Sequence, residues 1–187
     1  MQELCRAFGM CDDQSAIINT LNNVFIPACS RKQEIVFVCV GASHVCGDCF
    51  GAVVGDILLS MRLPIFIFGS TSSNVNAHNL RPTMQVVNLL HPNAVVVVVD
   101  SLSTTDPTTI GDIIISDEYV GLNKRVKICA DLFLYGVTTY LSPTRHNLHS
   151  KLTITQKLGV CLAKCIKHSI LRANRASKLT FLQKVVN

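Results

Sequence analysis

Two uninterrupted apolar runs dominate the pattern of hydrophobic and polar positions along this chain. Residues 35–40 read Ile-Val-Phe-Val-Cys-Val, and residues 94–99 read Ala-Val-Val-Val-Val-Val. Continuous β-branched runs of this length are typical of strands that are covered on both faces, as in a parallel sheet. The sequence therefore predicts two central, buried, parallel strands.

The segment between these runs alternates between helical and strand patterns. Apolar residues recur at helical spacing from about 48 to 61, residues 65–68 form a short apolar run, and a second helical pattern begins near Arg81-Pro82 and stops before Pro92. The order strand, helix, strand, helix, strand predicts an α/β fold with a mostly parallel, doubly wound sheet. We expect three layers, α/β/α, of the phosphorylase/hydrolase-like type.

The flanking segments predict further elements of a single domain spanning residues 1–187. We expect a short helix over 12–23, a loop at Pro27, and strands at 112–116, near 126–129 and at 132–140. A last helix is predicted from about 152 to 172, with one apolar face made by Leu158, Cys161, Leu162 and Cys165. Residues 173–187 form a basic tail that we expect to fray.

Composition and charge narrow the class of protein. Hydrophobic residues make up 49% of the chain and charged residues 16%, which is typical of a globular domain. No stretch reaches the roughly 20 apolar residues of a membrane span, and the N-terminus shows no secretory signal. Nine scattered cysteines fit a reducing compartment, so a cytoplasmic location is expected.

The positive charge is concentrated at one end of the chain. Residues 151–187 hold eight Lys or Arg and no Asp or Glu, although all 187 residues together carry a net charge of only +5. Such a segment can contact nucleic acid or an anionic membrane, or it can be a solvated helix face. We favour the solvated face.

Asp48 and Asp100 are the strongest candidates for chemistry. Asp100 directly follows the second apolar run, and Asp48 lies in a glycine-studded loop, 41–51, that follows the first. Ligands gather outside the carboxyl ends of the strands in open α/β sheets, so we expect both acids at one edge of the sheet. The simpler alternative is that Asp48 caps a helix and Asp100 forms a turn.

Two histidines raise the alternative of a metal centre. His78 follows the second strand, and His44 lies within the glycine loop. One imidazole beside two carboxylates would give three ligands to a divalent metal and leave a position open for water. The metal set would then be Asp48, Asp100 and His78, with His44 as an equal contender.

Several segments in the same order resemble the YyaC-like sporulation proteins. In that family a strand enters a loop reading Cys-Ile-Gly-Thr-Asp-Arg-Ser-Thr-Gly-Asp, which is similar to residues 39–48 here. The resemblance covers about residues 34–168 and is carried by these further segments: Phe68-Gly69-Ser70-Thr71, 75–80, Pro92-Asn93, the strand ending on Asp100, and Gly121-Leu122-Asn123-Lys124.

That family is related to germination proteases and, more distantly, to hydrogenase maturation endopeptidases. The resemblance implies a three-layer α/β fold in which the acids matching Asp48 and Asp100 are active-site carboxylates or, in the maturation enzymes, metal ligands. Ala42, Ser43 and His44 stand where the family has Thr-Asp-Arg, so one acid and one guanidinium are missing here.

Residues and resemblance together predict a cytoplasmic, sporulation-associated peptidase acting on a protein substrate. Asp48 and Asp100 would share a proton and activate water, and Asn123 and Lys124 would orient or polarise the scissile carbonyl. Two alternatives remain, a non-catalytic binding or scaffold protein and a metal-dependent hydrolase. The residues expected to bind substrate are Gly41, Ser43, His44, Gly47 and Asn79.

Overall fold

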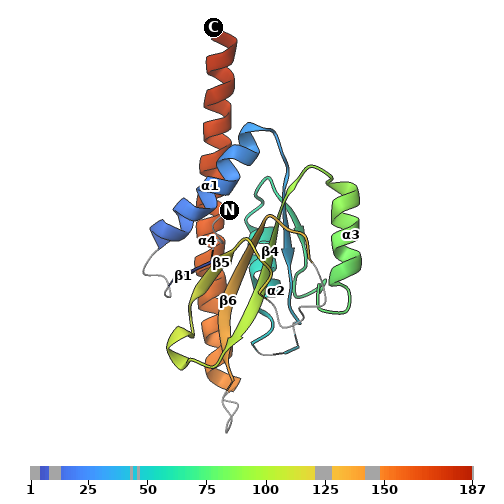
Figure 1. The fold of residues 1–187 in the computed structure, drawn as a ribbon, viewed down its shortest axis with the longest axis vertical. Coiled ribbons are helices and arrows are strands. Elements are labelled where there is room, and N and C mark those ends of the chain that lie inside the picture. The colour runs from blue at the N-terminus through green and yellow to red at the C-terminus, as the bar shows by residue number, and fades with distance from the viewer. Residues whose placement is uncertain are drawn as a thin grey trace.

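A six-stranded sheet forms the centre of the molecule (Figure 1). The computed structural model describes residues 5–8, 14–42, 44–45, 47–120, 128–141 and 148–186, of which 5–8, 148–151 and 179–186 are described by their backbone. The strand order is β1-β5-β6-β4-β2-β3. The strands are β1 (Cys5–Phe8), β2 (Ile35–Cys39), β3 (Phe66–Phe68), β4 (Val95–Thr104), β5 (Ile113–Ser116) and β6 (Leu132–Tyr140).

The sheet is mostly parallel, as the apolar runs predicted. β3, β2, β4 and β6 pair in parallel, with Phe37 of β2 opposite Val97 of β4. β5 is the reversed strand, because it pairs antiparallel with β6 on one side and with β1 on the other. All five side chains of β2 are buried, and so are the first five of β4, which explains why both read as unbroken apolar runs.

Helices cover both faces of this sheet and give the three layers that were expected. α1 (Gln14–Ser30), α2 (Phe50–Ser60) and α4 (Leu148–Val186) pack on one face, and α3 (Leu80–Leu90) packs on the other. β4 alternates between the two cores, since Val97 and Val99 face the first and Val96 and Val98 face the second. No helix within the described residues is long and apolar enough to cross a membrane.

The helices at the two ends of the chain differ from the prediction. α1 extends to Ser30 and includes Pro27, because Phe25 and Ala28 are buried in the core that α1 shares with α4 and β2, and their burial favours the helix over a loop. α4 continues to Val186 instead of ending near 172, and its predicted apolar residues Leu158 and Leu162 are fully buried. Tertiary packing along α1 therefore lengthens both helices.

Two strand predictions also need correction. β1 was not anticipated, since residues 5–8 are too few to show a period. The strand predicted near 126–129 does not form at 128–129, where the backbone has no regular structure, and 126–127 lie outside the described residues. The strands predicted at 112–116 and 132–140 correspond to β5 and β6.

Candidate functional site

The carboxyl end of β4 extends beyond its neighbour β2. β4 pairs with β2 as far as Val99, which lies opposite Cys39, but continues to pair with β6 as far as Thr104. Asp100 was expected to follow the strand, but it lies inside β4, opposite Tyr135. Pairing with β6 explains the difference. One edge of β4 is therefore open from Asp100 onward, at the place where β2 has ended.

The glycine loop brings Asp48 to this open edge. Gly47 has a φ of +91°, a left-handed conformation that favours glycine, and its carbonyl accepts a hydrogen bond from the hydroxyl of Thr138 on β6. The N–H of Asp48 donates to the carbonyl of Val45 at 3.0 Å, and its carbonyl accepts from the N–H of Ala42 at 3.1 Å. The backbone of Asp48 is thus fixed from both sides, while its side chain is exposed.

Gly51 allows the first turn of α2 to lie directly on the ends of the two central strands. A Cβ at this position would overlap the carbonyl oxygen of Val40 and come within 2.5 Å of the carbonyl oxygen of Val99. These contacts are with backbone, so they cannot relax by a rotamer change. Asp48 lies just before α2, and Asp100 directly follows Val99. The close approach of α2 to Val99 therefore brings the two acids near each other.

Ser101 joins the two acids. Its backbone N–H donates to Oδ1 of Asp100 at 2.7 Å, and its hydroxyl donates to Oδ1 of Asp48 at 3.0 Å. The first bond stays within β4, whereas the second spans the gap between the strand and the loop. A single serine therefore contacts both carboxyl groups that the sequence singled out.

The two acids have different environments. The pKa of the Asp100 carboxyl is raised to about 7. Burial is the largest cause, the hydrogen bond from the Ser101 N–H acts in the opposite direction, and the nearby charge of Asp48 adds to the increase. Asp100 is therefore partly protonated near neutral pH. Asp48, in contrast, is exposed to water and accepts a hydrogen bond from the hydroxyl of Ser101.

Tyr119 is a further neighbour of Asp100. Burial raises the pKa of its phenol, and the charge of Asp100 contributes in the same direction. Its ring centroid lies 5.8 Å from that of Phe133, and the N–H of Val120 donates to the hydroxyl of Tyr135 at 2.9 Å. These two contacts hold the segment before residue 121 against the face of the sheet on which Asp100 lies.

The other residues predicted to bind substrate or to assist catalysis do not all lie beside the two acids. Gly41 is buried and donates its N–H to the carbonyl of Val75, so it is part of the framework of the loop. His44 is exposed in the same loop. Ser43, Asn123 and Lys124 lie outside the described residues.

The predicted metal set does not assemble. Within the described residues, no three His, Cys, Asp or Glu side chains are grouped so that they could hold a metal ion. His78 is exposed beyond β3, and its N–H is bound to the side chain of Asn76 at 2.9 Å. His78 lies apart from Asp100 because it follows β3, and β2 lies between β3 and β4 in the sheet.

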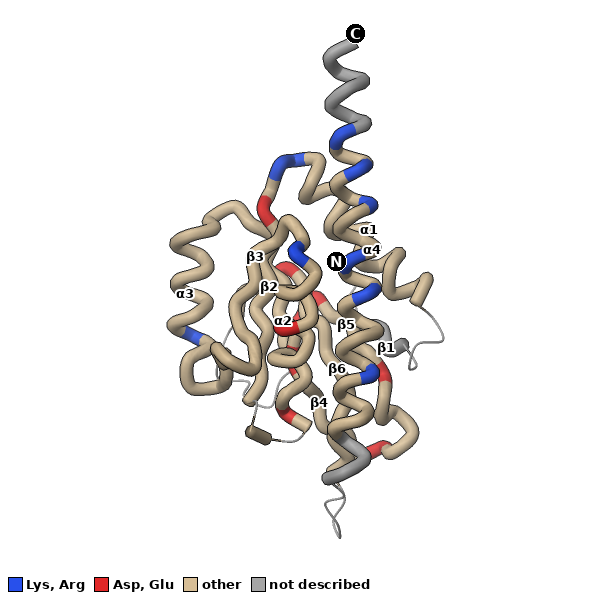
Figure 2. The backbone as a smooth tube through the Cα atoms, turned by 180° about the vertical axis from the view of Figure 1, so that it is seen from behind, with Lys and Arg blue, Asp and Glu red and all other residues tan. Residues whose placement is uncertain are grey.

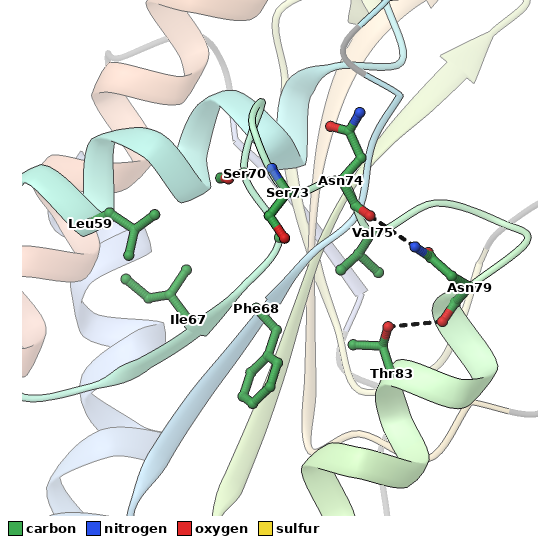
Figure 3. Close-up of a pocket in the computed structure, with 10 residues that line it drawn as sticks. Leu59, Ile67, Phe68, Ser70, Ser73, Asn74, Val75, Asn79 and Thr83 are labelled. Atoms are coloured by element: carbon green, nitrogen blue, oxygen red, sulfur yellow. Dashed lines mark hydrogen bonds between the residues drawn. The ribbon is translucent and has the colours of Figure 1, made fainter.

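Asn79 stabilises the β3–α3 loop beside a cavity. Its side-chain amide donates to the carbonyl of Asn74 at 2.9 Å, and its side-chain oxygen accepts from the N–H of Asn76 at 2.7 Å. The cavity has a volume of about 280 Å³ (Figure 3). The residues that line it are uncharged: Leu59, Ile67, Phe68, Gly69, Ser70, Ser73, Asn74, Val75, Asn79 and Thr83.

This cavity and the acid pair are neighbours on one edge of the sheet. Val75 lines the cavity and forms an isolated parallel bridge with Val40, and the N–H of Val40 donates to the carbonyl of Val99 at 2.7 Å. Two strand spacings separate Val75 from β4, which corresponds to about 10 Å.

Sequence reasoning missed Ser101, Tyr119 and Thr138. Ser101 had one detectable signal, since it directly follows the predicted acid and its hydroxyl is a hydrogen-bond donor. Tyr119 and Thr138 reach the site only through the pairing of β6 with β4 and the segment leading from β5. The spacing of residues along the sequence gives no indication that β6 pairs with β4.

Comparison with known proteins identifies relatives of this chain. The sequence model of a family described as protein of unknown function (DUF1256) matches residues 10–169. A protein of Bacillus subtilis (strain 168), named uncharacterized protein YyaC, is 28% identical over 161 residues, which span 79% of this chain and 78% of that protein. The resemblance to YyaC-like proteins inferred from the sequence is thereby confirmed.

A solved structure also resembles the chain. It is the crystal structure of a [NiFe] hydrogenase maturation protease, HycI, from Thermococcus kodakarensis KOD1. The sequence identity is 18%, and the match covers 79% of this chain and 99% of that one with a TM-score of 0.47. A likeness at that TM-score supports no inference about chemistry.

Proposed function

We propose that this chain, which belongs to the family described as protein of unknown function (DUF1256), hydrolyses peptide bonds with Asp48 and Asp100. The observation that carries the proposal is that Ser101 is bonded to both carboxyl groups at the open edge of β4. Two carboxyl groups in unequal surroundings can act as base and acid on one substrate.

Asp48 acts as the general base. Its exposed carboxylate removes a proton from a water molecule as the water oxygen attacks the scissile carbonyl carbon. The hydroxyl of Ser101 donates to one oxygen of Asp48 at 3.0 Å and fixes the direction of the other oxygen. Ser101 is therefore a positioning residue.

Asp100 acts as the general acid. A carboxyl group with a pKa of about 7 keeps a proton near neutral pH, and it gives this proton to the leaving nitrogen as the C–N bond breaks. The proton that Asp48 took from water then returns to Asp100, which restores the starting state. Asn123 and Lys124 retain their proposed role in polarising the carbonyl.

The shape of the sheet edge favours an extended polypeptide as the substrate. A chain lying across the carboxyl ends of β4, β2 and β3 would meet the acid pair first and the 280 Å³ cavity about 10 Å further on. Because that cavity has no charged lining residue, we propose that it receives an uncharged side chain. The YyaC-like resemblance adds spore formation as the proposed setting.

The test is cleavage of a random-sequence peptide library by the purified chain, read by mass spectrometry of the new termini. We expect cleavages with wild-type protein that disappear in Asp48→Asn and in Asp100→Asn, while both variants remain folded by circular dichroism. Cleavage that persists in both variants would refute the assignment, as would a wild-type protein that cleaves nothing in the library or in denatured protein substrates.

One observation favours a second function, that of a non-catalytic binding protein. Ala42 is buried where the family has a polar threonine, and the acid and guanidinium that follow it there are absent here. A binding protein would retain its affinity for a polypeptide partner in Asp48→Asn and Asp100→Asn, which separates this function from the peptidase.

A further inference from the structure

The outward face of α4 carries a continuous cationic stripe. Lys and Arg recur along the helix in Figure 2, and the helix contains no Asp or Glu. The basic residues of this helix whose side chains are described are all exposed. The stripe consists of Lys157, Lys164, Lys167, Arg172, Arg175 and Lys178.

Helical periodicity places these six residues on one side of α4. At 100° per residue they fall within an arc of about 140°, while the fully buried Leu158, Leu162 and Ile166 fall on the opposite side, against the body. The stripe extends about 30 Å from Lys157 to Lys178, at a rise of 1.5 Å per residue. α1, which packs along α4, has no charged residue that could neutralise it.

Exposed aliphatic side chains lie within the same stripe. Val160 is 41% exposed and Leu171 is 40% exposed, and both positions fall inside the arc of the basic residues. Beyond Lys178 the sequence continues Leu-Thr-Phe-Leu-Gln-Lys-Val-Val, which is apolar and basic without an acid, and the helix runs on to Val186. Figure 1 shows this end of α4 projecting past the rest of the molecule.

We propose that the stripe on α4 is a docking surface for an anionic phospholipid membrane. Basic residues are attracted to the negative surface of such a membrane, and aliphatic side chains among them can enter the boundary between headgroups and acyl chains. Most of the buried residues of α4 lie on the opposite side of the helix, and all six basic residues are exposed, so the stripe faces solvent. Nucleic acid would use the cations but gives no role to Val160 and Leu171, so the lipid surface is the better match.

The first experiment measures binding of the full chain to vesicles by co-sedimentation. We expect binding to phosphatidylcholine vesicles containing about 30% phosphatidylserine and much weaker binding to phosphatidylcholine alone. Lys164→Gln with Arg175→Gln should weaken binding about 25-fold, because each basic residue near the surface contributes about fivefold. The matched control, Arg62→Gln with Arg81→Gln, removes the same charge from exposed positions outside α4 and should change binding less than twofold.

The second experiment separates a lipid surface from other polyanions. Val160→Gln with Leu171→Gln should weaken vesicle binding several-fold and leave any binding to single-stranded RNA or duplex DNA unchanged. Leu89→Gln with Leu90→Gln, which are 80% and 61% exposed on α3, is the control. The proposal is overturned by absence of vesicle binding, by equal losses in the control variants, or by binding to nucleic acid alone.

Discussion

The hydroxyl of Ser101 lies 3.0 Å from Oδ1 of Asp48, although 53 residues separate them in the chain. The same serine donates its backbone N–H to Asp100. Replacement by alanine therefore removes the contact with Asp48 and leaves the contact with Asp100. This selectivity makes Ser101 the most informative single position in the site.

We expect Ser101→Ala to lower kcat/KM for a peptide cleaved by the wild-type chain by about 10-fold, since a hydrogen bond to a charged group contributes about 1.5–3 kcal/mol. The free energy of unfolding should change by less than about 1 kcal/mol, because the bond is at an exposed carboxylate. Ser103→Ala, at an exposed position two residues along β4, should leave both quantities unchanged. Equal effects of the two substitutions would contradict the positioning role.

Asp100 should make the stability of the fold decrease as the pH rises. Its pKa in the folded state, about 7, is above its ordinary value, so the folded chain binds more protons than the unfolded chain between about pH 4 and pH 7. The stabilisation is present below that window and is lost as the pH rises through 7. Asp100→Asn should therefore increase the free energy of unfolding by about 1–3 kcal/mol at pH 8, and by much less at pH 4. Urea unfolding at both pH values measures this, and an equal change at each would show that ionisation of Asp100 is not the cause.

The charge of Asp48 contributes to the raised pKa of Asp100. In Asp48→Asn we expect the titration midpoint of the Asp100 carboxyl, followed by carbon-13 NMR, to decrease from its wild-type position near 7. The midpoint should stay above the ordinary value of an aspartate, because burial is the larger cause. An unchanged midpoint would mean that the two carboxyl groups do not interact.

Gly51 should tolerate no side chain. Gly51→Ala places a Cβ against the backbone of Val40 and Val99, and we expect a loss of about 3 kcal/mol or more in the free energy of unfolding. Gly159→Ala in α4 is the matched control, since its Cβ would meet the side chain of Val53 at 3.2 Å and alanine favours a helix. We expect that control to change stability by less than about 1 kcal/mol, measured by urea unfolding. Comparable losses at the two glycines would show that the contact with the strand ends is not close.

The end of α4 is predicted to be structural as far as Ser177. The thiol of Cys29 lies 3.7 Å from Oδ1 of Asn174, and the hydroxyl of Ser177 donates to the carbonyl of Cys29 at 3.0 Å. A chain ending at Lys178 should keep its melting temperature within about 3 °C, whereas a chain ending at Ile170 should lose 5 °C or more, on the order of 1 kcal/mol or above. Equal melting temperatures for the two truncations would show that the contacts with α1 contribute nothing.

The sequence predicted those parts of the fold that are set by burial. β2 and β4 read as strands because both faces of each are covered, and the two acids were expected together because parallel strands end at one edge. Residues 101–104 (Ser-Leu-Ser-Thr) lie beyond the apolar run, yet they extend β4, since pairing with β6 satisfies their backbone. α4 passes its predicted end for a similar reason, because Asn174 and Ser177 find partners on α1.

The chemistry of the site was predicted less completely. Residue type and strand position were enough to single out Asp48 and Asp100, but the bridge through Ser101 depends on which side of β4 a serine faces. His78 lies apart from the two acids because the end of β3 is separated from β4 by a strand. Neither relationship can be read from spacing along the chain.

The packing of α1 on α4 also has a consequence for biosynthesis. Cys29 is bonded across 145 residues to Asn174, and β1 is paired with β5 across more than 100 residues. While the chain emerges from the ribosome, Phe25 of α1 can pack on Phe37 of β2, but the part of α1 that packs on α4 has no native partner until α4 has been made. The packing of α1 is therefore expected to be completed only after α4 has emerged, and to be slow because its contacts are distant in sequence. During that interval the buried face of α1 is a natural target for chaperones.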